Sequence, residues 1–198
     1  MKQMVNHKIG GLIKMKIGID IDDVLTNTSE KIKEYLDKYE KSGDGIKYIV
    51  QVMRGEIPTE NIKNFFDNYI NEICQNVTIK ENAAGTIKRL VEKGHKIIFI
   101  TSRGEKRFKG TEKTTLEYLK TYNIEYSNII FNSYEKQIDC KNNNIDIMID
   151  DSVKNCELVR KAGIRTIVYT TDVNKAIETD IERVESWEEI ENKIDALN

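Results

Sequence analysis

The sequence predicts an α/β protein built on a doubly wound parallel sheet of five strands. Five short runs rich in Ile, Val and Phe are nearly continuous rather than alternating, which is typical of parallel strands buried on both faces. Helical patterns separate most of these runs, as right-handed crossovers between parallel strands require. The predicted strands span 16–20, 96–101, 128–131, 146–150 and 165–169.

The helices between these strands follow from apolar side chains spaced three and four residues apart. Before the second strand, Gly94 marks the end of one such helix. Before the third strand, Leu116 and Leu119 are spaced to line the inner face of another. Ser186 and Glu189 form a capping-box pattern, which predicts that the last helix begins there.

One stretch interrupts the alternation of strands and helices. Directly after the first strand the pattern is helical only, with apolar faces at 32–39 and 62–73 and a Ser-Gly-Asp-Gly loop at 42–45. We therefore expect a helical cap inserted into the catalytic core, and a disordered leader ahead of the first strand. The expected boundaries are 1–14 for the leader, 15–25 and 80–198 for the core, and 26–79 for the cap.

Composition and charge narrow the range of functions. The 198 residues carry 31 basic and 33 acidic side chains, a net charge of −2. Such a chain has no long-range field that favours a nucleic acid polymer or a membrane surface. No apolar run approaches the roughly 18 residues of a membrane span, and the N-terminus is a poor signal peptide. We expect a cytoplasmic protein, and its three cysteines without a C-x-x-C pair fit a reducing compartment.

Acidic and hydroxyl side chains follow three of the predicted strands. The first strand ends in Asp-Ile-Asp-Asp at 20–23, the second in Thr-Ser-Arg at 101–103, and the fourth in Asp-Asp-Ser at 150–152. In an open parallel sheet, ligands bind outside the carboxyl ends of the strands, so these groups are expected to converge. The chain has only two histidines, which disfavours a His-based triad or a His-rich metal site.

Converging carboxylates suggest a specific chemistry. They repel one another unless a hard divalent cation such as Mg²⁺ lies between them. An aspartate beside Mg²⁺ can attack phosphorus and form an aspartyl-phosphate. A second carboxyl two residues later can protonate the leaving oxygen and then deprotonate water. A hydroxyl and a lysine would stabilise the charge on the phosphoryl oxygens.

These motifs resemble those of the haloacid-dehalogenase-like superfamily, in its D-x-D phosphatase branch. The runs at 17–25, 98–101 and 147–152 are similar to its first, second and fourth motifs. The third motif is a lysine, for which Lys136 matches best and Lys141 is the rival. The resemblance implies a Rossmann-like core with a cap after the first motif, and is closest to the 5′(3′)-deoxyribonucleotidase-like family.

The resemblance also implies roles for the acidic residues. Asp20 would be the nucleophile and a Mg²⁺ ligand, and Asp22 the acid/base, which also lends its backbone carbonyl to the metal. Asp150 would be a further ligand, and Asp151 a ligand directly or through water. Asp23 departs from the pattern, because many relatives have glycine there.

The remaining motif residues would contact the substrate. By the same resemblance, Thr101, Ser102 and Lys136 hold the phosphate. Arg103 either contacts the substrate or pairs with a surface glutamate. Structural interpretations also exist: Thr101 can cap its strand, and 150–152 can cap the following helix. Aromatic side chains of the cap, spaced as on a helix, belong either to its core or to the substrate cleft.

Together these features predict a Mg²⁺-dependent phosphomonoesterase that works through an aspartyl-phosphate. The expected substrate is a nucleoside or deoxynucleoside monophosphate, with a sugar phosphate or another small-metabolite phosphate as the alternative. An alternative of another class is a non-catalytic module that binds Mg²⁺ and phosphate, like a receiver domain. The sequence leaves open whether the protein is a monomer or a homodimer.

Overall fold

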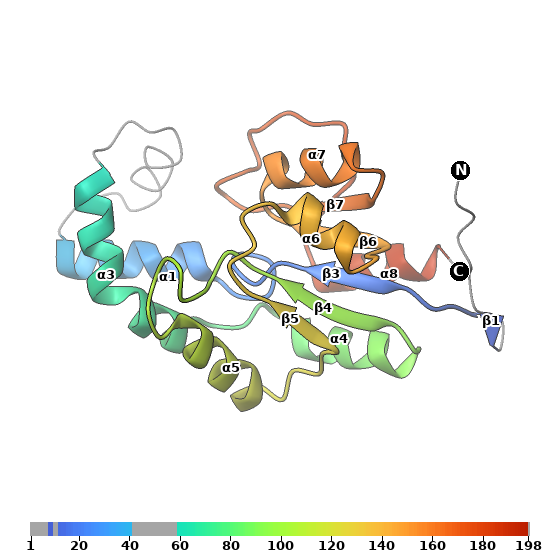
Figure 1. The fold of residues 1–198 in the computed structure, drawn as a ribbon, viewed down its shortest axis with the longest axis horizontal. Coiled ribbons are helices and arrows are strands. Elements are labelled where there is room, and N and C mark those ends of the chain that lie inside the picture. Colours follow the sequence, from blue (N-terminus) through green and yellow to red (C-terminus); the bar gives the residue numbers. More distant parts are fainter. Residues whose placement is uncertain (1–7, 10–11, 41–58, 198) are drawn as a thin grey trace.

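The computed structural model describes residues 8–9, 12–40 and 59–197. Figure 1 shows a central sheet with helices on both faces and the helices α1 (Thr28–Tyr35) and α3 (Thr59–Asn76) beyond one end of it. The strand order is β5-β4-β3-β6-β7-β8, and every neighbouring pair is parallel. The strands are β3 (Lys16–Ile19), β4 (Lys96–Ile100), β5 (Asn128–Ile130), β6 (Ile147–Asp150), β7 (Arg165–Tyr169) and β8 (Arg183–Val184).

The predicted doubly wound parallel sheet is confirmed, but it has six strands rather than five. The additional strand, β8, pairs with the end of β7 through Val168 and Tyr169. It consists of only two residues, Arg183 and Val184, so it leaves no apolar run in the sequence. An edge strand this short can be recognised only from its partner.

Helices cover both faces of the sheet, and apolar clusters lie on each face. In β4, Ile97 and Phe99 belong to the cluster with α4, α5 and α8, whereas Ile98 and Ile100 belong to the cluster with α6 and α7. Both faces of the strand are therefore buried, which is why its sequence does not alternate. The helices are α4 (Ala83–Glu92), α5 (Thr111–Thr121), α6 (Lys136–Asn142), α7 (Val153–Lys161) and α8 (Trp187–Asp195).

Close packing of the central strands explains a glycine in β3. A Cβ atom at Gly18 would lie 2.8 Å from Met148 Sδ on the neighbouring β6. Glycine therefore leaves the space that Met148 fills in the cluster with α6 and α7. In α5 the prediction for Leu116 is wrong. Leu116 is 41% exposed and Tyr118 faces the core instead, whereas the prediction for Leu119, which is fully buried, is confirmed.

The segment between β3 and α4 is helical where the structure describes it. It contains α1 (Thr28–Tyr35), the π-helical turn η1 (Leu36–Glu40) and α3 (Thr59–Asn76). Tyr35, Leu36, Phe65 and Ile73 form its own apolar cluster. We call residues 26–79 the helical insert. The predicted loop at 42–45 lies outside the described residues, and the predicted domain boundaries remain predictions.

The two ends of the helical insert lie side by side. Thr26 and Ile79 form an antiparallel bridge. Asn27 N donates to Thr78 O at 2.9 Å, and Lys80 N donates to Leu25 O at 2.9 Å. The chain therefore leaves the sheet region and returns to it at one place.

Little of the predicted leader is described. Two short strands, β1 (Lys8–Ile9) and β2 (Leu12–Ile13), pair antiparallel apart from the main sheet. A disordered leader at 1–14 remains a prediction. Within the described ranges, no helix has both the length and the apolar character that crossing a membrane needs.

Candidate active site

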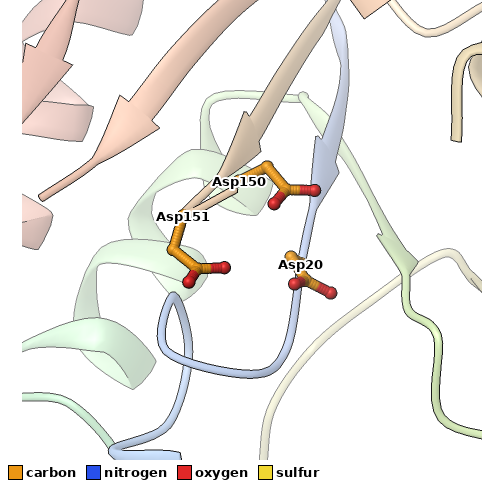
Figure 2. A group of neighbouring side chains, drawn as sticks. All are labelled: Asp20, Asp150 and Asp151. Carbon is orange, nitrogen blue, oxygen red and sulfur yellow. The ribbon is translucent and has the colours of Figure 1, made fainter. Parts of the chain in front are cut away.

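The acidic motifs meet at the carboxyl ends of two neighbouring strands. Asp20 directly follows β3, and Asp150 is the last residue of β6, with Asp151 after it. Asp20 N donates to Ile149 O at 2.9 Å, which continues the pairing of the two strands. Figure 2 shows the three carboxylates gathered at this edge. One oxygen from each lies within 4.8 Å of the others, as the predicted convergence requires.

Burial makes this acidic cluster costly to ionise. Asp150 is fully buried and Asp20 is 7% exposed. Burial raises the pKa of Asp20 to about 7, with Asp150 adding to the rise and Lys136 opposing it. Burial and the charge of Asp150 also raise the pKa of Asp151 well above its usual range. A divalent cation would stabilise the ionised form of these three carboxylates, because it would offset both their burial and their mutual repulsion.

The structure brings Lys136, rather than Lys141, into the acidic cluster. Lys136 is the first residue of α6 and is buried, whereas Lys141 on the same helix is exposed. Lys136 Nζ lies 2.6 Å from Asp150 Oδ2 and 2.9 Å from Asp20 Oδ1. Burial disfavours the ammonium, but the two carboxylates outweigh it and raise the pKa of Lys136. The lysine is therefore charged, and its charge compensates those of Asp20 and Asp150.

The start of α7 fixes the orientation of Asp150. Its Oδ1 accepts from Ser152 N at 2.8 Å, and its Oδ2 accepts from Asn155 Nδ2 at 3.3 Å. Ser152 Oγ caps the same helix by accepting from Asn155 N. The capping interpretation of 150–152 is confirmed at Ser152, and it is compatible with the site role of Asp150, which stays a prediction. Sequence reasoning missed Asn155, although its position in the first turn of α7 could have suggested it.

Asp22 forms an ion pair with Arg103 from the loop after β4. Arg103 Nη2 donates to Asp22 Oδ1 at 2.7 Å, and Thr28 Oγ1 donates to the same oxygen at 2.8 Å. Burial alone would raise the pKa of Asp22, but Arg103 and then Thr28 lower it below its usual value. Arg103 therefore pairs with a site carboxylate and not with a surface glutamate. Thr28, the first residue of α1, was not predicted.

The hydroxyl residues of the second motif lie beside the acidic turn. Ile19 pairs with Phe99, so Thr101 follows β4 next to residues 20–23. Thr101 is fully buried, and its Oγ1 accepts from Arg103 N at 3.2 Å. Ser102 is exposed. The structure thus places the residues of all three predicted strand ends in one region, with Lys136 among them.

Two pockets flank the turn that holds Asp22 and Asp23. The first, which we call the apolar pocket, has a volume of about 180 Å³ and lies between the helical insert and the loop after β4. Its lining includes Asp22, Ile32, Phe66, Ile70, Ser102 and Phe108. The second, which we call the polar pocket, has a volume of about 380 Å³. Its lining includes Asp23, Asn27, Ser29, Lys33, Lys80 and Thr171.

The parallel sheet, the acidic edge and the helical insert after β3 give this chain the fold of haloacid-dehalogenase-like hydrolases. A family model described as "5′ nucleotidase, deoxy (Pyrimidine), cytosolic type C protein" matches residues 14–197, and the chain belongs to this family. The protein is therefore a phosphoric monoester hydrolase. The non-catalytic module considered from the sequence is not supported.

Individual relatives agree with this assignment. A nucleotidase of Clostridium acetobutylicum is 24% identical over 190 residues, which cover 93% of this chain and 95% of the relative. The crystal structure of a predicted phosphatase from the same organism has a TM-score of 0.67 at 17% identity, covering 92% of this chain and 99% of that one. A haloacid dehalogenase-like hydrolase from Streptococcus pneumoniae has a TM-score of 0.66 at 14% identity, covering 91% and 98%. The two structures support the fold.

Proposed function

We propose that the protein is a Mg²⁺-dependent 5′-nucleotidase that forms an aspartyl-phosphate on Asp20. The single observation that carries this proposal is the contact of Lys136 with both Asp20 and Asp150 at the acidic edge. It combines a nucleophile, a metal-binding set and a cation for the phosphoryl oxygens within one buried cluster. We further propose a cytoplasmic location, with residues 26–79 as the cap of a core formed by 15–25 and 80–198.

The residues present fit a magnesium ion. Asp20, Asp150 and Asp151 would hold it, with a contribution from the backbone carbonyl of Asp22. Asp20 Oδ1 is buried and, apart from its ion contact with Lys136, has no hydrogen-bond partner among the described groups, so it can serve as a ligand. When bound, Mg²⁺ would neutralise charge on the carboxylates and on the phosphoryl group.

The chain's own residues account for both steps of hydrolysis. In the first step a bond forms between an Asp20 oxygen and phosphorus, the bond to the leaving oxygen breaks, and Asp22 gives that oxygen a proton. In the second, water attacks phosphorus, the bond to Asp20 breaks, and Asp22 takes the proton from water. Lys136, Thr101 and Ser102 hold the phosphoryl oxygens. Asp22 is ionised in the free protein, so its proton must arrive before the first step.

The apolar pocket supports a nucleotide as the substrate. Asp22 forms part of its wall, so a leaving group that fills it lies beside the acid/base. The rings of Phe66 and Phe108 lie 5.7 Å apart, centre to centre, and can contact the flat face of a nucleobase. A sugar phosphate is the second candidate, because the polar pocket offers the hydrogen-bonding side chains that a polyol needs.

Phosphate release from a panel of nucleoside monophosphates, deoxynucleoside monophosphates and sugar phosphates tests the proposal. Each compound is assayed with Mg²⁺ and with EDTA, using wild type, Asp20→Asn and the surface control Asp180→Asn. We expect Mg²⁺-dependent release from nucleotides that Asp20→Asn abolishes and Asp180→Asn preserves. Activity retained in Asp20→Asn would overturn the covalent mechanism. Release from sugar phosphates alone would overturn the substrate assignment.

A further inference from the structure

The guanidinium of Arg103 is buried in contacts with the protein itself. Arg103 is 6% exposed. Nε lies 3.1 Å and 3.2 Å from the two oxygens of Asp22, and Nη2 lies 2.7 Å from Oδ1. Nη1 donates to Thr115 Oγ1 on α5 at 3.3 Å. Each of its three nitrogen atoms thus has a protein partner, which argues against a direct role in binding the substrate phosphate.

The two oxygens of Asp22 are held unequally. Oδ1 accepts from Arg103 Nη2, from Arg103 Nε and from Thr28 Oγ1. Oδ2 has only the longer contact with Arg103 Nε, at 3.2 Å, among the described groups. The side chain of Asp22 is 30% exposed and forms part of the wall of the apolar pocket. Oδ2 is therefore the oxygen that remains available to a leaving group or to water.

We propose that Arg103 is a positioning residue that acts through Asp22, fixing the carboxylate so that Oδ2 is the oxygen that exchanges protons with the leaving group and with water. This inference rests on the proposed function. A fork of N–H donors suits this task, because two contacts to one carboxylate fix its orientation, whereas the ammonium of a lysine is a point charge. Arg103 also donates a hydrogen bond to Thr115 on α5, so α5 helps to fix the position of the guanidinium and, through it, of the Asp22 carboxylate.

A comparison of two substrates separates this role from others. A nucleoside monophosphate has a poor leaving group that needs a proton, whereas p-nitrophenyl phosphate releases a stable anion without one. For Arg103→Gln we expect kcat on the nucleotide to fall about tenfold to a hundredfold, less than the roughly hundredfold to ten-thousandfold that acid–base catalysis typically contributes, because Asp22 itself remains. KM should change less than about threefold, and the initial burst of nitrophenolate should persist. Arg103→Lys should recover only part of the loss.

The decisive measurement is a double-mutant cycle with Asp22→Asn. If Arg103 acts through Asp22, adding Arg103→Gln to Asp22→Asn should lower kcat by no more than about twofold. Independent, additive losses would overturn the inference, as would a large rise in KM for both substrates. Arg160→Gln, which removes an arginine paired with Asp180 on the surface, is the matched control. If Arg103→Gln does not fold, the cycle is run with Arg103→Lys.

The same experiment keeps the two proposals distinguishable. If wild type releases no phosphate, or Asp20→Asn remains active, the proposed function fails and the inference fails with it. If wild type is active, Asp20→Asn is inactive and the cycle is additive, only the role of Arg103 is overturned.

Discussion

Lys136 Nζ contacts carboxylates from two neighbouring strands, Asp150 Oδ2 at 2.6 Å and Asp20 Oδ1 at 2.9 Å. The lysine is 4% exposed, so its charge compensates these carboxylates where water cannot. One side chain therefore has two effects. It makes the acidic edge compatible with folding and, in the proposed mechanism, it presents a cation to the phosphoryl group.

Lys136→Met should remove both effects while the rest of the protein still folds. We expect loss of activity and, in EDTA, a decrease of about 3 kcal/mol in the free energy of unfolding, because a buried pair loses one partner. Mg²⁺ should restore part of the stability but not the activity. Urea denaturation with and without Mg²⁺ measures this. Lys141→Met should stay within about 0.5 kcal/mol of wild type. Equal effects of the two substitutions would contradict the assignment of Lys136.

Replacing Asp151 with asparagine should have opposite effects on thermal stability without and with Mg²⁺. Its pKa is raised by burial and by Asp150, so Asp151→Asn relieves repulsion and should raise the metal-free melting temperature. The same change removes a ligand of the proposed metal site and should reduce the increase in melting temperature that Mg²⁺ produces. Thermal unfolding in EDTA and in Mg²⁺ tests both effects, with Asp180→Asn as control. An unchanged response to Mg²⁺ would show that Asp151 does not contribute to the metal site.

His95 should make stability depend on pH. Its Nδ1 accepts from Met15 N at 3.2 Å, and burial lowers its pKa, with Lys93 adding to the effect and Asp195 opposing it. The folded pKa lies below the unfolded one, so the stability from this group is present above about pH 6.5 and is lost as the pH falls through the folded pKa. His95→Asn keeps an acceptor but does not titrate.

Urea denaturation at about pH 7.5 and about pH 5 tests this, because His titrates between them. The difference in unfolding free energy between the two pH values should be smaller in His95→Asn than in wild type. His7→Asn is the control, since the protein has only these two histidines. An equal difference in all three proteins would exclude His95 as the source.

The apolar pocket should determine affinity for the base. Phe66→Ala or Phe108→Ala should raise KM for a nucleoside monophosphate about tenfold, the loss expected for one aromatic stacking partner. Neither change should affect KM for acetyl phosphate, which has no ring to bind. Steady-state kinetics on both substrates measures this, with the exposed Leu116→Ala as control. If KM rises equally for both substrates, the aromatic side chains support the fold rather than the base.

Asp23 is expected to tolerate asparagine but not alanine. Its φ is 58°, in the left-handed region, and its carboxylate accepts from Ser29 N at 2.8 Å and from Ser29 Oγ at the start of α1. Asparagine adopts this conformation and keeps an acceptor. Alanine disfavours the left-handed conformation and has no side-chain acceptor for Ser29, so Asp23→Ala should reduce the free energy of unfolding by about 2 kcal/mol. Equal denaturation midpoints for the two variants would contradict this account.

The sequence predicts the site well where its geometry follows from strand order. Asp20 and Asp150 end runs that are apolar throughout, and such runs become adjacent parallel strands in this fold class. Their convergence therefore required no knowledge of side-chain conformations. The start of α8 was predicted for a similar local reason: Ser186 Oγ accepts from Glu189 N, a contact between residues three apart.

What the sequence could not show depends on contacts over long separations. Arg103 and Asp22 are 81 residues apart, and their pairing depends on side-chain conformations. The choice of Lys136 over Lys141 depends on where α6 begins relative to β6. Leu116 was assigned inward because its spacing to Leu119 is helical, but Tyr118 took the buried place. Periodicity identifies a helix more reliably than the direction that it faces.

The paired ends of the helical insert have a consequence for how this protein can change. Backbone hydrogen bonds from Asn27 to Thr78 and from Lys80 to Leu25 close the insert at its base. The two ends of the insert are therefore as close together as the ends of a tight turn, and the length of the segment between them does not change how they join the sheet. Such points accept added or exchanged segments without disturbing the surrounding fold. The helical insert, which we propose contacts the leaving group, can thus diverge while Asp20, Asp150 and Lys136 keep their places.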